Sequence, residues 1–223
     1  MCTTKETKKD GIVYYCTFPE KNFMQERKIA RAMLKKCFME FFGREFEEES
    51  VKIGRHGKPY YDGFKFVQFN ISHCKTGAAA VVSNVPVGID VERMRWVNVR
   101  TVVKCCSMKE RSYIFEKAAC QEEKVLSTEE MNRFLKLWTL KESYVKMTGE
   151  GFSHALWEIP FDLEGISEKE QEPIFLADSG RGVLSCLYLT KQLYMALSVL
   201  KKEHHGNVNF EWKTFDLSDK IEI

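Results

Sequence analysis

The sequence predicts an α+β fold, and three observations support this prediction. The apolar pattern along the chain is strand-like, then helical, then strand-like, then helical and strand-like again, instead of alternating regularly. Hydrophobic residues make up 44% of the 223 residues and charged residues 30%, which is typical of a globular protein. The length alone leaves one large domain and two small halves both open, because ~100–200 residues per domain is a soft guide. The order of elements could hold two similar halves that pack closely, and we place them at residues 1–97 and 98–223.

The first half is expected to contain one helix and several strands. Residues 11–18 (GIVYYCTF) are rich in β-branched and aromatic residues and stop before Pro19, which predicts a strand. Residues 22–42 carry apolar side chains at helical spacing, and Gly43 supplies a helix end. A loop with several glycines, GRHGKPYYDG, precedes three strand-like runs, FKFVQFNISH, GAAAVVSNV and VPVGIDVERM.

The second half is expected to begin with two helices and to continue as strands. The helices are predicted at residues 98–120 and 127–148, and Ser127 and Glu130 form a capping box for the second. Runs near IFLA, VLSCLYL and YMALSVL, separated by DSGRG and TKQ, predict a meander of antiparallel strands.

Charge and cysteine content exclude several classes of protein. The net charge is only +2 on 34 basic and 32 acidic side chains, so no overall field favours nucleic acid or a membrane surface. The N-terminus lacks a signal peptide and no ~18-residue apolar run is present, so we expect a cytoplasmic protein. The eight cysteines form no C-x-x-C pair and are expected to be reduced.

The segment PVGIDVERM places two carboxylates side by side. On a strand, residues two apart share a face, so Asp90 and Glu92 point together while the valines and Ile89 point the other way. Two adjacent carboxylates repel each other unless a cation or a basic side chain compensates. The sequence leaves two solutions open, a divalent cation or an ion pair with Arg93 or Arg95.

The segment FLKLWTLKESYVKMTGEG predicts a helix with charged residues at the border of its apolar face. Glu142 and Lys146 lie four residues apart beside Trp138, and Lys141 falls inside the apolar arc, where something must receive its ammonium group. Two alternatives are open. In one, Glu142 and Lys146 form a surface ion pair and Lys141 extends to solvent; in the other, Glu142 is a metal ligand or a base and the two lysines contact phosphate.

A third group of polar residues ends the strand FNISH and occupies the preceding loop. Ser72, His73 and Lys58 have side chains that donate hydrogen bonds to phosphate oxygens, and the neighbouring glycines allow close approach of a ligand. The same residues also occur in ordinary turns. A Walker loop, a G-x-G-x-x-G motif and a G-x-S-x-G motif are absent.

Four motifs in order resemble those of the Sfp-type 4′-phosphopantetheinyl transferases. They are GKP at 57–59, FNISH at 69–73, VGIDVE at 87–92 and WTLKESYVK at 138–146. The resemblance implies two α/β halves related by a pseudo-twofold axis, with coenzyme A in the cleft between them. It also implies transfer of phosphopantetheine to a serine of an apo acyl or peptidyl carrier protein, with release of adenosine 3′,5′-bisphosphate.

The same resemblance implies a role for each matching residue. Asp90, Glu92 and Glu142 would be ligands of Mg²⁺, or of Mn²⁺ in its place. Asp90, Glu142 and Lys146 would be the catalytic residues, with Glu142 removing the serine proton directly or through a metal-bound water, and Lys146 also holding the pyrophosphate. The remaining contacts to the nucleotide and its 3′-phosphate would come from Arg27, Arg31, Lys58, Pro59, Ser72 and His73.

Other features of the resemblance concern partners and departures. Cys74 stands where the family often has a small polar residue, and Glu110 stands where some relatives have an acid or where a helix surface would carry one. The carrier protein is expected near the basic and apolar side chains of Arg93, Arg95, Trp96 and Lys117. A monomer is expected. Two alternatives remain, a non-catalytic protein that binds coenzyme A or the carrier, and a different Mg²⁺-dependent phosphotransferase.

Overall fold

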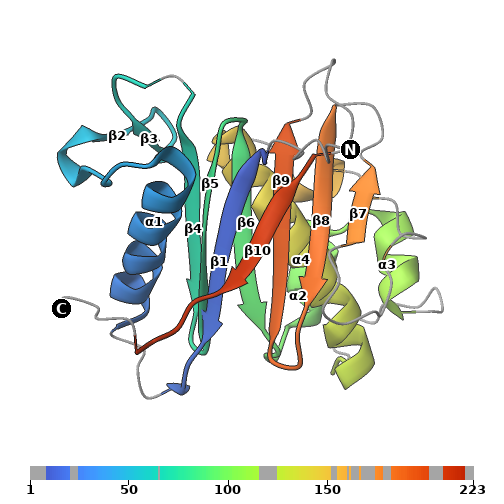
Figure 1. Cartoon of the computed structure of the whole chain (residues 1–223). Helices are drawn as coiled ribbons and strands as arrows, with labels where there is room; N and C mark the ends of the chain where they lie inside the picture. Colours follow the sequence, from blue (N-terminus) through green and yellow to red (C-terminus); the bar gives the residue numbers. More distant parts are fainter. Residues whose placement is uncertain are drawn as a thin grey trace, which may run out of the picture.

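Figure 1 shows the computed structural model of the chain. The structure describes residues 9–20, 25–64, 66–115, 125–151, 155–159, 161, 166, 182–200 and 208–218, and the backbone of 174–177. Within these residues the chain forms two four-stranded sheets and a two-stranded hairpin, accompanied by helices. The predicted α+β class is confirmed.

The first sheet has the strand order β10-β1-β5-β4. Strands β1 and β4 are both antiparallel to β5, whereas β10 is parallel to β1. The predicted strands of the first half are therefore present, but β10 was not predicted. The strands are β1 (Gly11–Thr17), β4 (Gln68–Cys74), β5 (Gly77–Ser83) and β10 (Phe210–Thr214).

The second sheet has the order β6-β9-β8-β7, and all its neighbouring strands are antiparallel. The predicted meander near the C-terminus is confirmed as β7, β8 and β9, and β6 joins its free side. The strands are β6 (Val87–Arg93), β7 (Ile174–Ala177), β8 (Val183–Leu189) and β9 (Leu193–Leu200).

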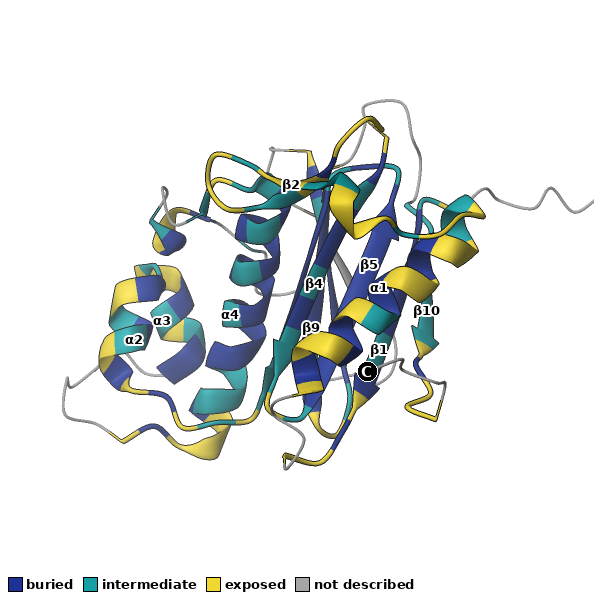
Figure 2. Cartoon of the chain, turned by 90° about the vertical axis from the view of Figure 1, so that its left-hand side faces the viewer, coloured by how far each residue is buried: buried dark blue, intermediate teal, exposed yellow. Residues whose placement is uncertain are grey.

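The two sheets pack face to face between two long helices (Figure 2). Helix α1 (Glu26–Phe42) covers the outer face of the first sheet, where alternate residues such as Ile12 and Tyr14 contact it. The inner residues, such as Val13, pack against the inner face of the second sheet. Helix α4 (Thr128–Thr148) covers the outer face of the second sheet. Because successive side chains of a strand alternate in direction, each strand contributes to two cores.

Both long helices end as the sequence predicts. In α1, Gly43 adopts a left-handed conformation with φ of 68° and its N–H bonds to the carbonyl of Met39. In α4, Ser127 and Glu130 make both hydrogen bonds of the capping box. The C-terminal end of α4 is Gly149, which has φ of 70°. Helix α1 begins at Glu26, and the earlier residues of the predicted helix include 22–24, which lie outside the described residues.

The helix predicted at residues 98–120 is instead two short helices, α2 (Val99–Cys105) and α3 (Met108–Phe115). The break has a physical cause, because Ser107 and Glu110 exchange two hydrogen bonds that start a new helix: the Ser107 N–H donates to Glu110 and the Glu110 N–H donates to the Ser107 hydroxyl. Residues 116–120 of the prediction lie outside the described residues.

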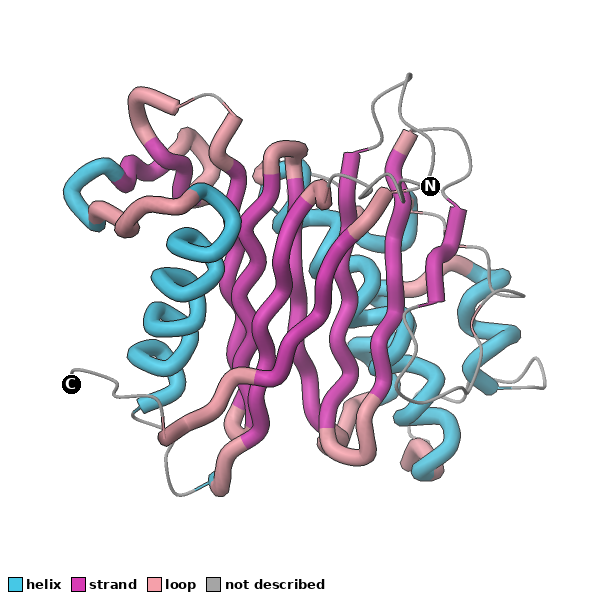
Figure 3. The backbone as a smooth tube through the Cα atoms, in the orientation of Figure 1, coloured by secondary structure: helices cyan, strands magenta, loops and turns pink. Residues whose placement is uncertain are grey.

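Two short strands, β2 (Val51–Ile53) and β3 (Pro59–Tyr61), form a hairpin beside the end of α1 (Figure 3). The sequence pattern indicates only a loop over most of this segment. Of the GKP residues, Gly57 and Lys58 lie in the turn of this hairpin and Pro59 begins β3, so the pairing of β2 with β3 holds the motif at the hairpin end.

The sheets exchange strands across the predicted boundary at residue 97. Strand β6 precedes the boundary but pairs with β9 in the second sheet, and β10 follows it but pairs with β1 in the first sheet. Each sheet is nonetheless covered by one long helix, the first by α1 and the second by α4. The division of the chain at residue 97 stays a prediction.

Two remaining expectations concern cysteines and membranes. The described cysteines, at positions 16, 37, 74, 105, 106 and 186, are all free, whereas Cys2 and Cys120 lie outside the described residues. Among the residues that the structure describes, no helix combines the length and the apolar character that crossing a membrane requires.

Candidate functional site

Helix α4 approaches strand β6 unusually closely at Gly88. A Cβ atom at this position would lie 2.2 Å from both the Met147 nitrogen and the Ser143 oxygen of α4. Only glycine therefore allows this packing. Because side chains on a strand alternate, Asp90 and Glu92 share the Gly88 face, and the helix brings Glu142 and Lys146 toward them.

Asp90 is the centre of a buried hydrogen-bond network. Lys146 Nζ donates to Asp90 Oδ1 at 2.6 Å and to Ser72 Oγ at 2.9 Å, and Ser72 Oγ donates to the same Asp90 oxygen at 3.0 Å. Asp90 is only 5% exposed, and its second oxygen, Oδ2, has no hydrogen-bond donor among the described residues. A buried carboxylate oxygen without a donor is costly, so this atom is free to receive a cation.

Glu142 shares the electrostatic environment of both strand acids. Burial raises the pKa of its carboxyl to about 7, and repulsion by Asp90 and Glu92 adds to this while Lys146 opposes it. At neutral pH a fraction of Glu142 is therefore protonated in the protein without a bound cation. The predicted grouping of Asp90, Glu142 and Lys146 is present in the structure.

Glu92 is turned toward different partners. Its Oε1 accepts a hydrogen bond from Trp138 Nε1 at 2.9 Å, and both of its oxygens lie 3.2 Å from nitrogens of Arg95. This is the ion-pair alternative that the sequence left open. Across the described ranges, no three side chains of His, Cys, Asp or Glu are grouped closely enough to hold a metal. Asp90 and Glu92 both act electrostatically on Glu142, but the three acids do not form a metal-binding group among the described residues, and their role as ligands stays a prediction.

Strand β4 joins the two sheets at this site through side chains. Asn70 Oδ1 accepts a hydrogen bond from the Ile89 N–H at 2.9 Å, and Ser72 Oγ accepts one from the Val91 N–H at 3.1 Å. These bonds satisfy the N–H groups on the edge of β6 that β9 does not pair. Asn70 is a site residue that was not predicted, although it lies two residues before Ser72 and therefore on the same face of β4.

A hollow of about 280 Å³ lies between the GKP turn and the end of α4. Its lining includes Lys58, Pro59, Asn70, Glu142, Lys146 and Gly149. It therefore connects the predicted nucleotide residues with the network around Asp90. Its size and lining suit part of a nucleotide.

Lys58 lies at this hollow but uses its ammonium group inside the protein. Nζ donates to the carbonyls of Met147 at 2.7 Å and Val87 at 3.1 Å, which ties the GKP turn to α4 and β6. Burial lowers the pKa of this amine to about 8. Two of the three N–H donors of this ammonium group are thus used inside the protein, which leaves one for a ligand. The predicted contact of Lys58 with the nucleotide stays a prediction.

His73 and the two arginines of α1 lie on the first half. His73 Nδ1 is 3.0 Å from Glu26 Oε1, and burial, Arg27 and Lys146 lower the pKa of the imidazole, whereas Glu26 raises it. Arg31 is paired with Glu48 at 3.4 Å. It lines a separate hollow of about 330 Å³ beside the β2–β3 hairpin.

Lys141 does not reach the candidate site. Its ammonium is 2.7 Å from Glu110 Oε1 and donates to the carbonyls of Leu156 and Ile159, and its side chain is 1% exposed. The alternatives of a surface lysine and of a phosphate contact are therefore both wrong for this residue. Glu110 is likewise neither a surface residue nor part of the acid group, since it holds the Lys141 ammonium.

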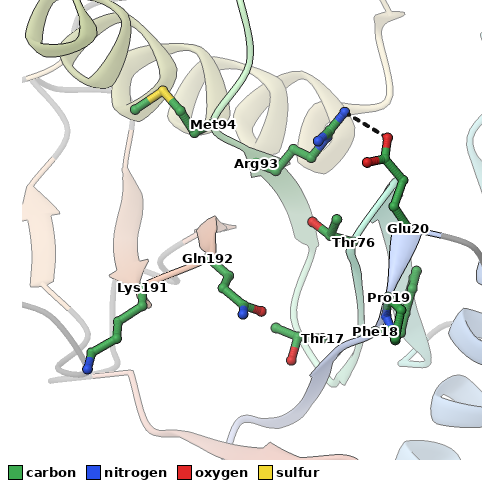
Figure 4. Close-up of a pocket in the computed structure, with 9 residues that line it drawn as sticks. All are labelled: Thr17, Phe18, Pro19, Glu20, Thr76, Arg93, Met94, Lys191 and Gln192. Carbon is green, nitrogen blue, oxygen red and sulfur yellow. Dashed lines mark hydrogen bonds and ion pairs between the residues drawn. The ribbon is translucent and has the colours of Figure 1, made fainter.

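Two further hollows lie outside the acid group. One, of about 550 Å³, lies where β1, β6 and two hairpin turns meet, and Figure 4 shows Arg93 paired with Glu20 on one side and Lys191 and Gln192 on the other. The other, of about 630 Å³, lies between α2 and the 3₁₀ helix η4 (Leu156–Glu158). Trp138, the partner of Glu92, lines this second hollow.

The carboxylate of Glu142 and the ammonium group of Lys146 border the hollow, and Asp90 is bound to Lys146 beside it. The family model of the 4′-phosphopantetheinyl transferase superfamily matches residues 86–203 of this chain. The chain belongs to this superfamily. The matched stretch contains Asp90, Glu92, Glu142 and Lys146, whereas the GKP and FNISH motifs precede it.

Several curated proteins are similar to the chain. It is 31% identical over 123 residues to the 4′-phosphopantetheinyl transferase gsp of Aneurinibacillus migulanus, covering 55% of this chain and 48% of that protein. It is 29% identical over 98 residues to the 4′-phosphopantetheinyl transferase Sfp of Bacillus subtilis, covering 44% and 40%. The chain thus spans about half the length of the curated relatives it matches.

Among solved structures, the holo-[acyl-carrier-protein] synthase of Thermotoga maritima is similar with a TM-score of 0.37 and 18% identity. The match covers 53% of this chain and 64% of that chain. The fold described above rests on the strands and helices themselves.

Proposed function

We propose that the protein transfers the 4′-phosphopantetheine group of coenzyme A to a serine of an apo acyl or peptidyl carrier protein, releasing adenosine 3′,5′-bisphosphate. The observation that carries this proposal is that Glu142 and Lys146 line one hollow while Lys146 bonds the buried Asp90, all within the stretch that matches the superfamily. The same stretch supplies the similarity to transferases of bacilli.

The acids suit a magnesium ion. Asp90 Oδ2 is buried without a donor among the described residues, and Glu142 is repelled by its neighbours, so a cation here would relieve both. We propose that Asp90 and Glu142 hold Mg²⁺, or Mn²⁺ in its place, with Glu92 as a third ligand once it leaves Arg95. When bound, the ion supplies positive charge beside the pyrophosphate of the donor.

The protein side chains have three further proposed roles: stabilising the leaving group, removing the serine proton and contacting the nucleotide. Lys146 holds the pyrophosphate and stabilises the charge that develops on the leaving bisphosphate. Glu142 takes the proton of the attacking serine, and its raised pKa is consistent with a base that works near neutral pH. Lys58, Pro59, Ser72, His73, Arg27 and Arg31 are proposed to contact the nucleotide and its 3′-phosphate.

The hollow beside α2 is the proposed place for the carrier protein. Arg100 and Lys104 supply positive charge, and Trp138 and Trp157 supply apolar surface, so the hollow suits an acidic amphipathic helix. Trp138 also bonds Glu92, which places this surface next to the acids. Two other residues were expected near the carrier protein. Trp96, four residues before Arg100, is 64% exposed, and Lys117 lies outside the described residues.

The test is incubation of the protein with coenzyme A, Mg²⁺ and an apo carrier, followed by mass spectrometry of the carrier. The expected result is one added phosphopantetheine, which requires the carrier serine and disappears with a serine-to-alanine carrier. Binding of coenzyme A without added mass over acyl and peptidyl carriers would favour the non-catalytic alternative. Turnover of nucleotides that lack pantetheine would favour another phosphotransferase. A monomeric, cytoplasmic protein stays a prediction.

A further inference from the structure

Glu26 is a buried carboxylate that belongs to none of the four motifs. It lies in the first turn of α1, its side chain is 7% exposed, and its Oε1 is 3.0 Å from His73 Nδ1. The other oxygen, Oε2, has no hydrogen-bond donor among the described residues. A carboxylate is rarely buried unless a partner requires it there.

The charge environment of His73 comes from two helices. Glu26 and Arg27 face it from α1, and Lys146 faces it from α4. Arg27 and Lys146 disfavour a protonated imidazole, as does burial, whereas Glu26 favours it. Among the described charged groups that act on His73, Glu26 favours protonation of the imidazole, whereas Arg27 and Lys146 oppose it.

The contact also fixes which ring nitrogen carries hydrogen. An ionised carboxylate only accepts hydrogen bonds, so Nδ1 of His73 must be the donor. In the neutral imidazole, Nε2 then carries a lone pair and repels an anionic oxygen. After protonation, Nε2 becomes a donor to that oxygen.

We infer that Glu26 is a positioning residue, which orients His73 and holds the charge of its protonated form, so that binding of the 3′-phosphate of the donor takes up a proton. The inference rests on the proposed function, because it takes coenzyme A as the ligand. The chemical group recognised is a phosphomonoester, and Glu26 acts on it only through His73. Preference for donors that carry this phosphate should therefore depend on Glu26.

The experiment compares coenzyme A with 3′-dephospho-coenzyme A by calorimetry, in buffers of different ionisation enthalpy at pH 7.5 with Mg²⁺. The wild-type protein is expected to take up close to one proton with coenzyme A and far less with the dephospho compound. Glu26→Gln should lower affinity for coenzyme A about ten-fold, leave the dephospho compound unchanged, and reduce the proton uptake. Glu26→Asp should restore part of the preference.

Glu211→Gln is the matched control. Glu211 lies on β10, at the opposite edge of the same sheet from His73, and its carboxylate is paired with Lys9 and Lys213. Its removal should therefore change neither the affinity for coenzyme A nor the proton uptake. The inference is overturned if Glu26→Gln loses the same affinity for coenzyme A and for 3′-dephospho-coenzyme A. It is also overturned if the number of protons taken up does not change. Either result leaves the proposed function standing. Failure of the wild-type protein to bind either ligand overturns both.

A second measurement does not depend on a variant. The ring nitrogens of His73 in the ¹⁵N-labelled wild-type protein should show hydrogen on Nδ1 and none on Nε2 at pH 8. On addition of coenzyme A both nitrogens should become protonated. Hydrogen on Nε2 in the free protein would overturn the inference.

Discussion

The ammonium group of Lys146 lies 2.6 Å from Oδ1 of Asp90, and the two residues come from different elements, α4 and β6. The protein therefore supplies its own cation to the carboxylate that is proposed to bind magnesium. Binding of the donor would move Lys146 from the carboxylate to a phosphate. The ion pair thus links binding of the metal to binding of the nucleotide.

The first prediction tests this link with Lys146→Gln. Without coenzyme A, the variant should bind Mn²⁺ several-fold more tightly than the wild type, because no ammonium competes for Asp90. Its rate of transfer should nonetheless fall by about 10²-fold, since the leaving bisphosphate loses its cation. Calorimetric titration with Mn²⁺ and the carrier assay measure the two effects. Lys35→Gln removes an exposed ammonium of α1 and serves as the control.

Unchanged Mn²⁺ affinity in Lys146→Gln would show that the ammonium does not compete with the metal. Weaker Mn²⁺ binding by Lys146→Gln than by the wild type would equally contradict this competition.

The second prediction concerns pH and Glu142. Its pKa is raised from 4.5 to about 7 in the folded protein, so the folded state holds more protons than the unfolded state between these values. The contribution of Glu142 to stability therefore falls as pH rises from about 4.5 to about 7. Glu142→Gln should lack this loss and become more stable than the wild type at pH 7.5, by on the order of 1 kcal/mol.

Urea unfolding in EDTA at pH 4.5 and pH 7.5 measures this difference between variant and wild type. Added Mg²⁺ should raise wild-type stability at pH 7.5 and have little effect on Glu142→Gln. The same variant should show no measurable transfer. A stability difference that does not change with pH would contradict the assignment of a raised pKa.

The third prediction concerns Gly88. Alanine at this position places a methyl group 2.2 Å from the backbone of α4, so the helix must move away from β6. We expect a loss of about 1–3 kcal/mol in the free energy of unfolding and a much larger loss of transfer activity, because Glu142 and Lys146 move with the helix. Gly54→Ala, whose methyl group meets its nearest atom at 3.1 Å, should cost less. A fully active Gly88→Ala protein would show that the close approach is unnecessary.

The fourth prediction concerns the buried pair of Lys141 and Glu110. Replacing Lys141 by Met leaves a buried carboxylate without its cation and should lower stability by about 3–5 kcal/mol. The double variant Lys141→Met with Glu110→Leu should recover much of this loss. Urea unfolding checks both, and the KM for coenzyme A measured at low temperature should stay near the wild-type value. A large rise in KM with normal stability would instead indicate a phosphate contact.

Much of the site could be predicted because its residues lie in local patterns. Strand alternation was enough to place Asp90 and Glu92 on one face, and helical spacing was enough to place Glu142 near Lys146. Neither pattern could show that Glu92 turns to Trp138 or that Asn70 pairs with the edge of β6. Those contacts depend on how the two sheets meet, which no local pattern encodes.

The parts of the fold that were missed depend on distant pairing or on an overlooked signal. Strand β10 is short and pairs with a strand about two hundred positions earlier, so its partner cannot be read from its neighbours. The break between α2 and α3 was visible, because Ser107 and Glu110 have the same spacing as Ser127 and Glu130. The position of Lys141 in the apolar arc showed that its ammonium group needs an acceptor, but it could not show that the acceptors are Glu110 and the carbonyls of Leu156 and Ile159.

The pairing of β6 with β9 sets an order of events during synthesis of the protein. The strand that carries Asp90 leaves the ribosome long before Leu193–Leu200, its only neighbour in the described part of the second sheet. Until that later segment emerges, β6 is held only by the side chains of β4 along one edge, and α4 lacks the part of its packing surface that β9 supplies. A nascent chain that stops before residue 193 carries every acid of the site but lacks the strand that pairs with β6 and packs against α4, so full activity should appear only once translation has passed β9.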